Sequence, residues 1–352
     1  MLEVADVAEL QATGVGEDAG VGVEDPQLWT GTVGRDAAGV GEIAVARDPI
    51  WPRFPILANR HPFWHPVGNG SNGARRMSDD PNAVVSHYGD GGLRQRIEQG
   101  LTAAGVDLRA VTTRDLAPVD EFHSRGRLAT RELAALAAPV SGERVLDVGS
   151  GLGGPARYLA ETFGCEVTGI DLTPEFCEVG NWLSELTGLS PKVRLETGSG
   201  TALPLPDGHF DLAWTMQMQM NISDKARLYR EIHRVLRPGG RFVLQELAQG
   251  AGGPCHLPAP WSSDPATSHL VSPDDLRGVV EAAGFVTTEW RDTTDDALAW
   301  YAQHNSKVDA ALPVLGTHLV MGDDHERKRH NVQRNYREGR LHQVMGAFRR
   351  GD

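Results

Sequence analysis

Cysteine is scarce in this chain of 352 residues. Cys165, Cys177 and Cys255 are its three cysteines, and none of them forms a C-x-x-C pair. Without paired spacing they predict neither a disulfide framework nor a metal site, and they favour a reducing, cytoplasmic environment. No apolar stretch approaches about 18 residues, and the N-terminus has no basic segment followed by an apolar one. The sequence therefore predicts no membrane span and no secretory signal.

Positive charge is also in short supply. The chain has 34 Lys and Arg against 47 Asp and Glu, which gives a net charge of -13 and a pI near 5.5. Because nucleic-acid binding needs clustered cations against phosphates, we expect no nucleic-acid partner. The one basic run, residues 326–330, is followed by Arg334, Arg337 and Arg340 at helical spacing, and we interpret it as a solvated helix face.

Glycine is plentiful, and its most informative cluster lies in residues 145–154, Val-Leu-Asp-Val-Gly-Ser-Gly-Leu-Gly-Gly. A short apolar strand runs here into a tight turn, where backbone without a Cβ can take positive φ and approach a ligand closely. Gly149, Gly151 and Gly154 also satisfy the G-x-G-x-x-G spacing of a dinucleotide site. The glycines alone do not decide the ligand, but Asp147 in the strand and the motifs downstream help to do so.

The segments after this turn alternate between helices and apolar strands. A helix over 155–163 leads to a strand over 166–170, which ends in Asp171, 17 positions after Gly154 and near the spacing of about 20 expected for a ribose-binding acid. Further strands are predicted at 192–196, 212–216, 241–247 and 285–292. This alternation predicts an α/β fold, a Rossmann-like, doubly wound and mostly parallel sheet with helical N- and C-terminal cap segments.

Four elements in this order resemble the class I S-adenosylmethionine-dependent methyltransferases. They are the Leu-Asp-Val-Gly-Ser-Gly turn, the acid Asp171, the segment Leu-Pro-Leu-Pro-Asp-Gly-His-Phe-Asp at 203–211, and Glu-Ile-His-Arg-Val-Leu-Arg-Pro-Gly-Gly at 231–240. The chain is similar to bacterial small-molecule members in the neighbourhood of sarcosine, phosphoethanolamine and tocopherol methyltransferases. The resemblance implies that S-adenosylmethionine is the cofactor and S-adenosylhomocysteine the product.

The resemblance also implies where the cofactor binds. Asp147 would order the glycine turn or the cofactor's amino group, and Asp171 would hold the ribose hydroxyls, with Leu172 against the adenine. Many relatives have Gly-Asp-Ala after the third strand, whereas this chain has Gly-Ser-Gly at 198–200, so that Ser199 or the backbone after it would take over the adenine contact. The predicted cofactor-binding residues are Asp147, Gly149, Gly151, Gly153, Asp171, Leu172, Ser199, Gly200, Thr201, Ala202, Met216 and Gln217.

The segment after the fourth strand also departs from the family pattern. It reads Met-Gln-Met-Gln-Met-Asn at 216–221, and Asn221 stands where relatives often have a His. The alternating methionines suit either an adaptable apolar lining or ordinary core. We predict that Gln219, Asn221 and Trp261 contact the substrate.

Methyl transfer is an in-line displacement in which positioning supplies most of the acceleration, so a general base is needed only when the acceptor must lose a proton. The predicted candidates for catalysis are Glu246 at the end of the fifth strand, His256 in a proline-rich loop, and His123 before the domain. Each has a plain structural alternative: a solvated strand-end acid, a surface-loop residue and helix-start packing, respectively.

The chain divides into four predicted parts. Residues 1–76 lack sustained periodicity and are expected to be a disordered extension, with a partner-binding tail as the alternative. Residues 77–136 are predicted to be a helical N-terminal cap, 137–295 the cofactor-binding Rossmann-like domain, and 296–352 a helical C-terminal segment, with the usual seventh strand absent or rearranged.

The predicted function is methyl transfer to an N, O or C atom of a small molecule, with an amine ranked slightly above an aromatic ring. Two alternatives stay open: a non-catalytic relative that serves a protein partner, and a nicotinamide-dependent oxidoreductase suggested by the glycine spacing. A homodimer through the C-terminal segment is a further expectation.

Overall fold

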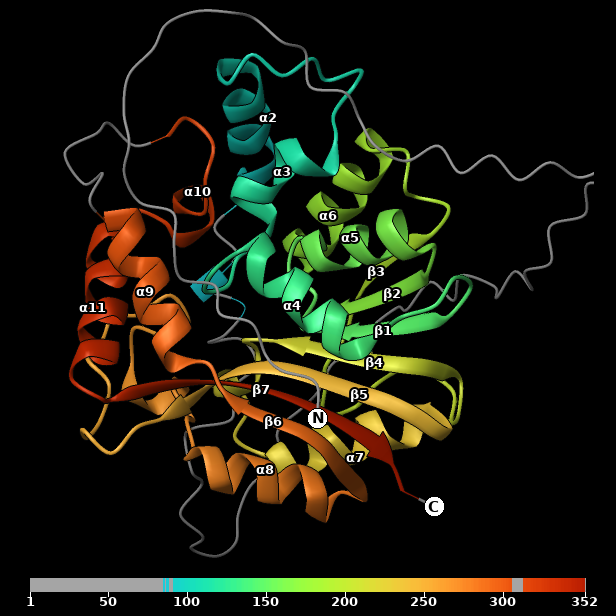
Figure 1. Cartoon of the computed structure of the whole chain (residues 1–352). Coiled ribbons are helices and arrows are strands. Elements are labelled where there is room, and N and C mark those ends of the chain that lie inside the picture. The colour runs from blue at the N-terminus through green and yellow to red at the C-terminus, as the bar shows by residue number, and fades with distance from the viewer. Residues whose placement is uncertain (1–84, 86, 89–90, 306–312, 352) are drawn as a thin grey trace, which may run out of the picture. The chain divides into compact units, whose positions relative to one another are not determined.

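A seven-stranded sheet forms the centre of the fold in a computed structural model, which describes residues 85, 87–88, 91–305 and 313–351 (Figure 1). Its strand order is β3-β2-β1-β4-β5-β7-β6. The strands are β1 (Arg144–Val148), β2 (Glu166–Asp171), β3 (Val193–Thr197), β4 (Phe210–Met216), β5 (Leu236–Gln249), β6 (Phe285–Asp292) and β7 (Leu341–Arg350). β1 to β5 pair in parallel, and β7 pairs antiparallel with both β5 and β6. The predicted Rossmann-like, mostly parallel sheet is confirmed.

Helices pack on both faces of this sheet and extend beyond its edge (Figure 1). They are α2 (Leu93–Ala103), α3 (Thr113–Asp120), α4 (Arg127–Ala137), α5 (Gly154–Phe163), α6 (Pro174–Leu186), α7 (Lys225–Val235), α8 (Pro273–Ala282), α9 (Thr294–Asn305), α10 (His318–Met321) and α11 (His325–Arg337). None of the helices in the described part of the chain is long and apolar enough to cross a membrane.

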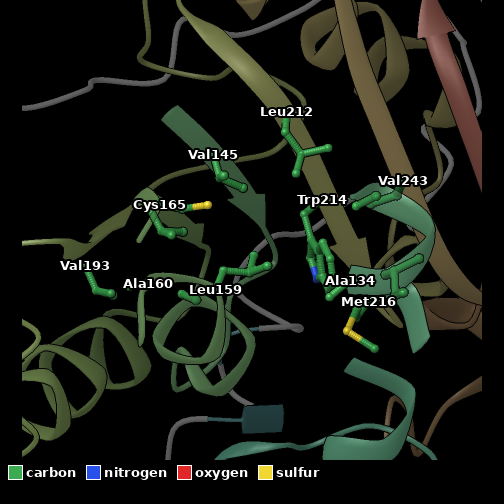
Figure 2. Close-up of a cluster of buried hydrophobic side chains, with 14 of the residues drawn as sticks. Ala134, Val145, Leu159, Ala160, Cys165, Val193, Leu212, Trp214, Met216 and Val243 are labelled. Atoms are coloured by element: carbon green, nitrogen blue, oxygen red, sulfur yellow. The ribbon is translucent and has the colours of Figure 1, made fainter. Parts of the chain in front are cut away.

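The parallel strands are apolar on both faces because helices cover both. In β1, Val145 belongs to one buried cluster and Leu146 to the other, as side chains that alternate across a strand must. Figure 2 shows the first cluster, in which Trp214 and Leu212 of β4 lie with side chains of β1, β5 and the helices α4 and α5. Because both faces are buried, these strands are short continuous apolar runs, and such runs could be recognised in the sequence.

The C-terminal segment differs from the prediction. Residues 296–352 were expected to be helical, and a seventh strand to be absent or rearranged, but after α9, α10 and α11 the chain forms β7. This strand inserts between β5 and β6 and is buried from Val344 to Phe348. Because both faces of β7 are covered, its sequence has no polar-apolar alternation to distinguish it from a buried helix.

The N-terminal cap is helical in the described residues. α2, α3 and α6 share an apolar cluster with side chains next to and within α10. α3 was not predicted from the sequence, although a capping box between Thr112 and Asp115 begins it. The predicted extension, residues 1–76, lies outside the described residues.

Candidate active site

A cavity of about 1640 Å³ lies at the carboxyl ends of β1, β2 and β4. Its lining comes from the glycine turn after β1, the segment after β4, and the helices α9, α10 and α11. Residues 120–126 around His123, called the entry segment below, also contribute. Open α/β sheets bind ligands at this edge. The volume exceeds the roughly 300–1,000 Å³ of an ordinary ligand pocket, so the cavity has room for two ligands side by side.

The glycine turn sits tightly against the segment after β4. Gly149 has a φ of 75°, and a Cβ placed on it would lie 2.5 Å from Cβ of Met218. Gly151 also has positive φ, 53°. Glycine is therefore required at position 149 both by conformation and by space. The N–H groups of Gly149 and Ser150 donate to the Ile170 carbonyl, which fixes the turn against the end of β2.

Asp171 organises this end of the cavity. Its Oδ2 accepts a hydrogen bond from the Gly151 N–H at 2.9 Å, and its Oδ1 accepts one from the Thr173 N–H at 2.9 Å. Burial raises the pKa of this carboxyl group, while the backbone donors lower it in part. The carboxylate lines the cavity and has further acceptor capacity for hydroxyl groups of a ligand.

Asp147 carries an unsatisfied polar atom. It is buried, lines the cavity, and its Oδ2 has no hydrogen-bond partner among the described residues. Burial, together with the charges of Asp171 and Glu121, raises the pKa of Asp147 to about 8. Three carboxyl groups thus gather at one end of the cavity, and a ligand with positive charge would offset their mutual repulsion.

The loop after β3 was expected to contact adenine. Ser199, Gly200 and Thr201 line the cavity, and so does Leu172 after β2. The Ser199 and Thr201 hydroxyl groups lie 2.9 Å apart and bond to each other. Because this bond occupies Ser199 Oγ, the side chain is less available as an adenine acceptor than an Asp would be.

Two of the twelve predicted cofactor residues do not line the cavity. Ala202 forms a bridge with Ser199 inside the turn. Gly153 begins α5 in the left-handed region, with φ of 79°, and faces Leu195 and Arg157. The other ten predicted residues line the cavity, whereas these two shape the backbone of the turns.

The segment after β4 is held in a strained conformation at Gln217, which has a φ of 48° although it is not glycine. Gln217 Oε1 accepts a hydrogen bond from the Ser124 N–H at 3.1 Å, and its Nε2 donates to Gln245 Oε1 at 3.3 Å. Met216 and Gln217 both line the cavity, as predicted. Gln217 thereby joins the segment after β4 to the entry segment.

Glu246 does not line the cavity, which corrects its prediction as a catalytic base. It is fully buried, and its Oε2 accepts hydrogen bonds from the N–H groups of Met218 at 3.1 Å and Gln219 at 3.3 Å. Gln219 is also buried and donates from Nε2 to the Leu247 carbonyl at 2.7 Å, so it is not a substrate contact either. Both side chains shape the loop that carries Met218 and Asn221.

We expect Glu246→Gln to change how stability depends on pH. Burial raises the pKa of Glu246 to about 7, above the unfolded value of about 4.3. The folded state therefore binds the carboxyl proton of Glu246 more tightly than the unfolded state does. The contribution of this proton to the free energy of unfolding is present at low pH and is lost as pH rises through about 7. Between pH 5 and 8 the free energy of unfolding of the wild type should fall relative to the variant, on the order of 2–3 kcal/mol.

Urea unfolding of the wild type and Glu246→Gln at several pH values from 5 to 8 measures the difference in their free energies of unfolding. The titration of all other groups is common to both proteins and cancels in this difference. The exposed Glu98→Gln is the matched control. A difference between wild type and Glu246→Gln that stays constant from pH 5 to 8 contradicts the assignment.

The two predicted histidines have different surroundings. His123 lines the cavity, and its Nε2 lies 3.0 Å from Oε2 of Glu121, a buried acid that also pairs with Arg127. His256 is paired with Glu338 at 2.8 Å and is not among the lining residues. His256 is therefore a loop contact, whereas His123 remains a predicted base, oriented by Glu121.

Asn221 and Trp261, two of the predicted substrate contacts, lie next to each other on the cavity wall. Asn221 Nδ2 donates to the Trp261 carbonyl at 2.7 Å, and Asn221 Oδ1 accepts from the Tyr88 hydroxyl at 3.2 Å. All three residues line the cavity. Tyr88, which belongs to the predicted N-terminal cap, was not predicted as a site residue.

The lining contributed by α9, α10 and α11 was also missed, because no motif marks it. In the parts of the chain that the structure describes, no group of three or more His, Cys, Asp or Glu side chains is placed to hold a metal ion.

Comparisons with known proteins agree with this geometry. Residues 146–244 match the family of methyltransferase domains. This part of the chain is therefore similar to methyltransferase domains. A solved geranyl diphosphate C-methyltransferase from Streptomyces coelicolor A3(2), in complex with S-adenosyl-L-homocysteine, shares the fold with a TM-score of 0.57 and 19% identity, over 78% of this chain and 99% of that one.

Curated relatives match only part of the chain. A probable tocopherol O-methyltransferase from Oryza sativa is 39% identical over 36% of this chain, and a sarcosine/dimethylglycine N-methyltransferase from Halorhodospira halochloris is 28% identical over 50%. The match spans 36% of the first relative and 63% of the second. These relatives act on different acceptors, so the similarity identifies the domain and not the substrate.

Proposed function

We propose that this protein transfers a methyl group from S-adenosylmethionine to an N, O or C atom of a small molecule. The observation that carries the proposal is the pairing of Asp171 with the Gly151 N–H at one end of a large cavity. This pairing stands in a methyltransferase domain. A dinucleotide site could use the same glycine turn, but it would not account for the buried Asp147 in β1.

The residues at this end of the cavity suit the cofactor. Asp171 would hold the ribose hydroxyls, and the glycine turn would bind the methionine part. Asp147, with its unpaired Oδ2, would face positive charge. S-adenosylmethionine supplies an electrophilic methyl on a sulfonium: the acceptor's lone pair forms a bond to that carbon, and the C–S pair of electrons stays on sulfur.

The chain's own contribution is positioning and the exclusion of water. The segment after β4, clamped by Glu246 and Gln217, presents Met216, Met218 and Asn221 to the cavity. His123 would accept a proton where the acceptor must lose one. Glu246 is not on the cavity wall, so it does not supply a carboxylate that would favour an amine acceptor.

Calorimetric titration of the full chain with S-adenosylmethionine, S-adenosylhomocysteine and NADH tests the proposal. We expect micromolar binding of the first two and none of NADH. Binding of NADH instead would support the oxidoreductase alternative. Adenosyl binding without methyl transfer to any of a panel of amines, phenols and amphiphilic acids would favour a non-catalytic relative.

Two other expectations stay predictions. A cytoplasmic location is inferred from the scarce cysteines. The homodimer through the C-terminal segment can be measured by light scattering at several protein concentrations.

A further inference from the structure

The end of the cavity away from the glycine turn is lined by cationic and imidazole side chains. α11 contributes Arg329 and His330, and α10 contributes His318. Arg327 and Glu326 also line the cavity, and both are exposed. The basic run was interpreted from the sequence as a solvated helix face. Glu326, Arg327 and His330 are exposed as that interpretation requires, but Lys328 is buried and Arg329 is half-buried at the cavity.

Arg329 is the cation of interest because it has no counter-ion. It is half-buried, and within the described residues its guanidinium has no hydrogen-bond or ion-pair partner. Two other cations of α11 are paired: Lys328 Nζ lies 2.8 Å from Asp324 and donates to the Met321 carbonyl at 2.7 Å, and Arg334 lies 2.6 Å from Glu338. Arg329 differs from the exposed Arg327 of the same helix because it is half-buried. A half-buried guanidinium left with its donors unused is costly unless a ligand satisfies them.

Arg329 lines the cavity together with His318 of α10 and Tyr301 of α9. Burial lowers the pKa of His318, and the charges of His325 and Arg329 lower it further. Burial raises the pKa of Tyr301, while its hydrogen bond with Ser124 and the charge of Arg329 oppose that rise. The Tyr301 hydroxyl lies 3.2 Å from Ser124 Oγ, and the Ser124 N–H donates to Gln217 in the segment after β4.

The wall between the two ends is largely apolar. Met220, Trp261, Leu247 and Val332 belong to one buried cluster, and all four line the cavity. The acidic end, with Asp147 and Asp171, suits a cationic ligand, the middle suits a hydrocarbon or ring, and the α11 end suits an anion.

We propose that the methyl acceptor is an amphipathic anion, with an apolar body along the Met220 and Trp261 wall and a phosphate or carboxylate group bound by Arg329. This rests on the proposed function, since it assigns the cofactor to the opposite end. A planar guanidinium binds either anion through two parallel hydrogen bonds, which accounts for an arginine at this position.

The test uses the full chain and three probes that share one apolar chain: decyl phosphate, decanoate and decan-1-ol. Each is titrated calorimetrically with S-adenosylhomocysteine at saturation, and again without it. We expect at least one anionic probe to bind about tenfold or more tightly than decan-1-ol. The ratio between decyl phosphate and decanoate then identifies which anion the site prefers.

Arg329→Gln is expected to remove this preference, leaving the anions and the alcohol within about threefold of each other. Arg337→Gln is the matched control, because Arg337 is on the same helix, is exposed, and does not line the cavity. Equal binding of anions and alcohol by the wild type overturns the proposal, and so does an equal loss in both variants. Absence of S-adenosylhomocysteine binding refutes the proposed function instead, and the probe titrations without it still report on Arg329.

Discussion

Asp171→Ala should lower the affinity for S-adenosylhomocysteine by about a hundredfold or more. The variant would lose the proposed acceptor for the ribose hydroxyls, and it also releases the Gly151 and Thr173 N–H groups, which the carboxylate holds at 2.9 Å each. A hydrogen bond to a charged group contributes roughly 1.5–3 kcal/mol, and about 1.4 kcal/mol corresponds to tenfold in affinity. Two such bonds to the ribose therefore suffice for the expected loss.

Calorimetric titration measures this affinity, and thermal unfolding verifies that the variant is folded. Asp295→Ala is the matched control, because Asp295 is an exposed acid in the first turn of α9 outside the cavity. Asp171→Asn separates the charge from the side-chain volume. Unchanged affinity in a folded Asp171→Ala protein would refute the placement of the cofactor.

Arg157→Met should cause the largest loss of stability, about 3–5 kcal/mol. The guanidinium of Arg157 and the carboxylate of Asp120 form a fully buried ion pair at 2.8 Å. Arg157 also donates to the carbonyl groups of Leu152 at 2.5 Å and Gly180 at 2.9 Å. Without Arg157 the buried Asp120 keeps its position but loses the cation that compensates its charge.

Urea denaturation measures this loss. Arg194→Met is the matched control, because the ion pair of Arg194 with Glu196 leaves the arginine side chain 77% exposed, and such surface pairs contribute less than about 1 kcal/mol. The double variant Asp120→Asn, Arg157→Met should recover part of the stability, since the charge and its partner are then removed together. Equal losses in Arg157→Met and Arg194→Met would contradict the role of the buried pair.

Loss of this pair should affect ligand binding as well as folding. Asp120 is the last residue of α3, Leu152 is in the glycine turn, and Gly180 is in α6. One side chain therefore joins the N-terminal cap to the cofactor end of the cavity. Neither Arg157 nor Asp120 was recognised from the sequence, because an arginine inside an ordinary helix carries no motif.

The sequence by itself determined the sheet of parallel strands, the glycine turn and the acid at the end of β2. These features depend on short-range requirements: continuous apolar runs for strands covered on both faces, positive φ at Gly149, and a carboxylate at a strand end. Each requirement is met within a few residues, so it leaves a pattern that can be read along the chain. The resemblance to methyltransferases rested on the order of these patterns.

Tertiary structure alone decided which polar side chains face the cavity. Glu246 lies beneath the segment after β4 and accepts hydrogen bonds from its backbone, whereas Arg329 lies on the cavity wall. The two positions depend on how the 82 residues of chain between them fold. β7 is likewise a strand only because β5 and β6 both offer it an edge. Side-chain direction and strand pairing depend on contacts between residues far apart in the sequence, and no local pattern records them.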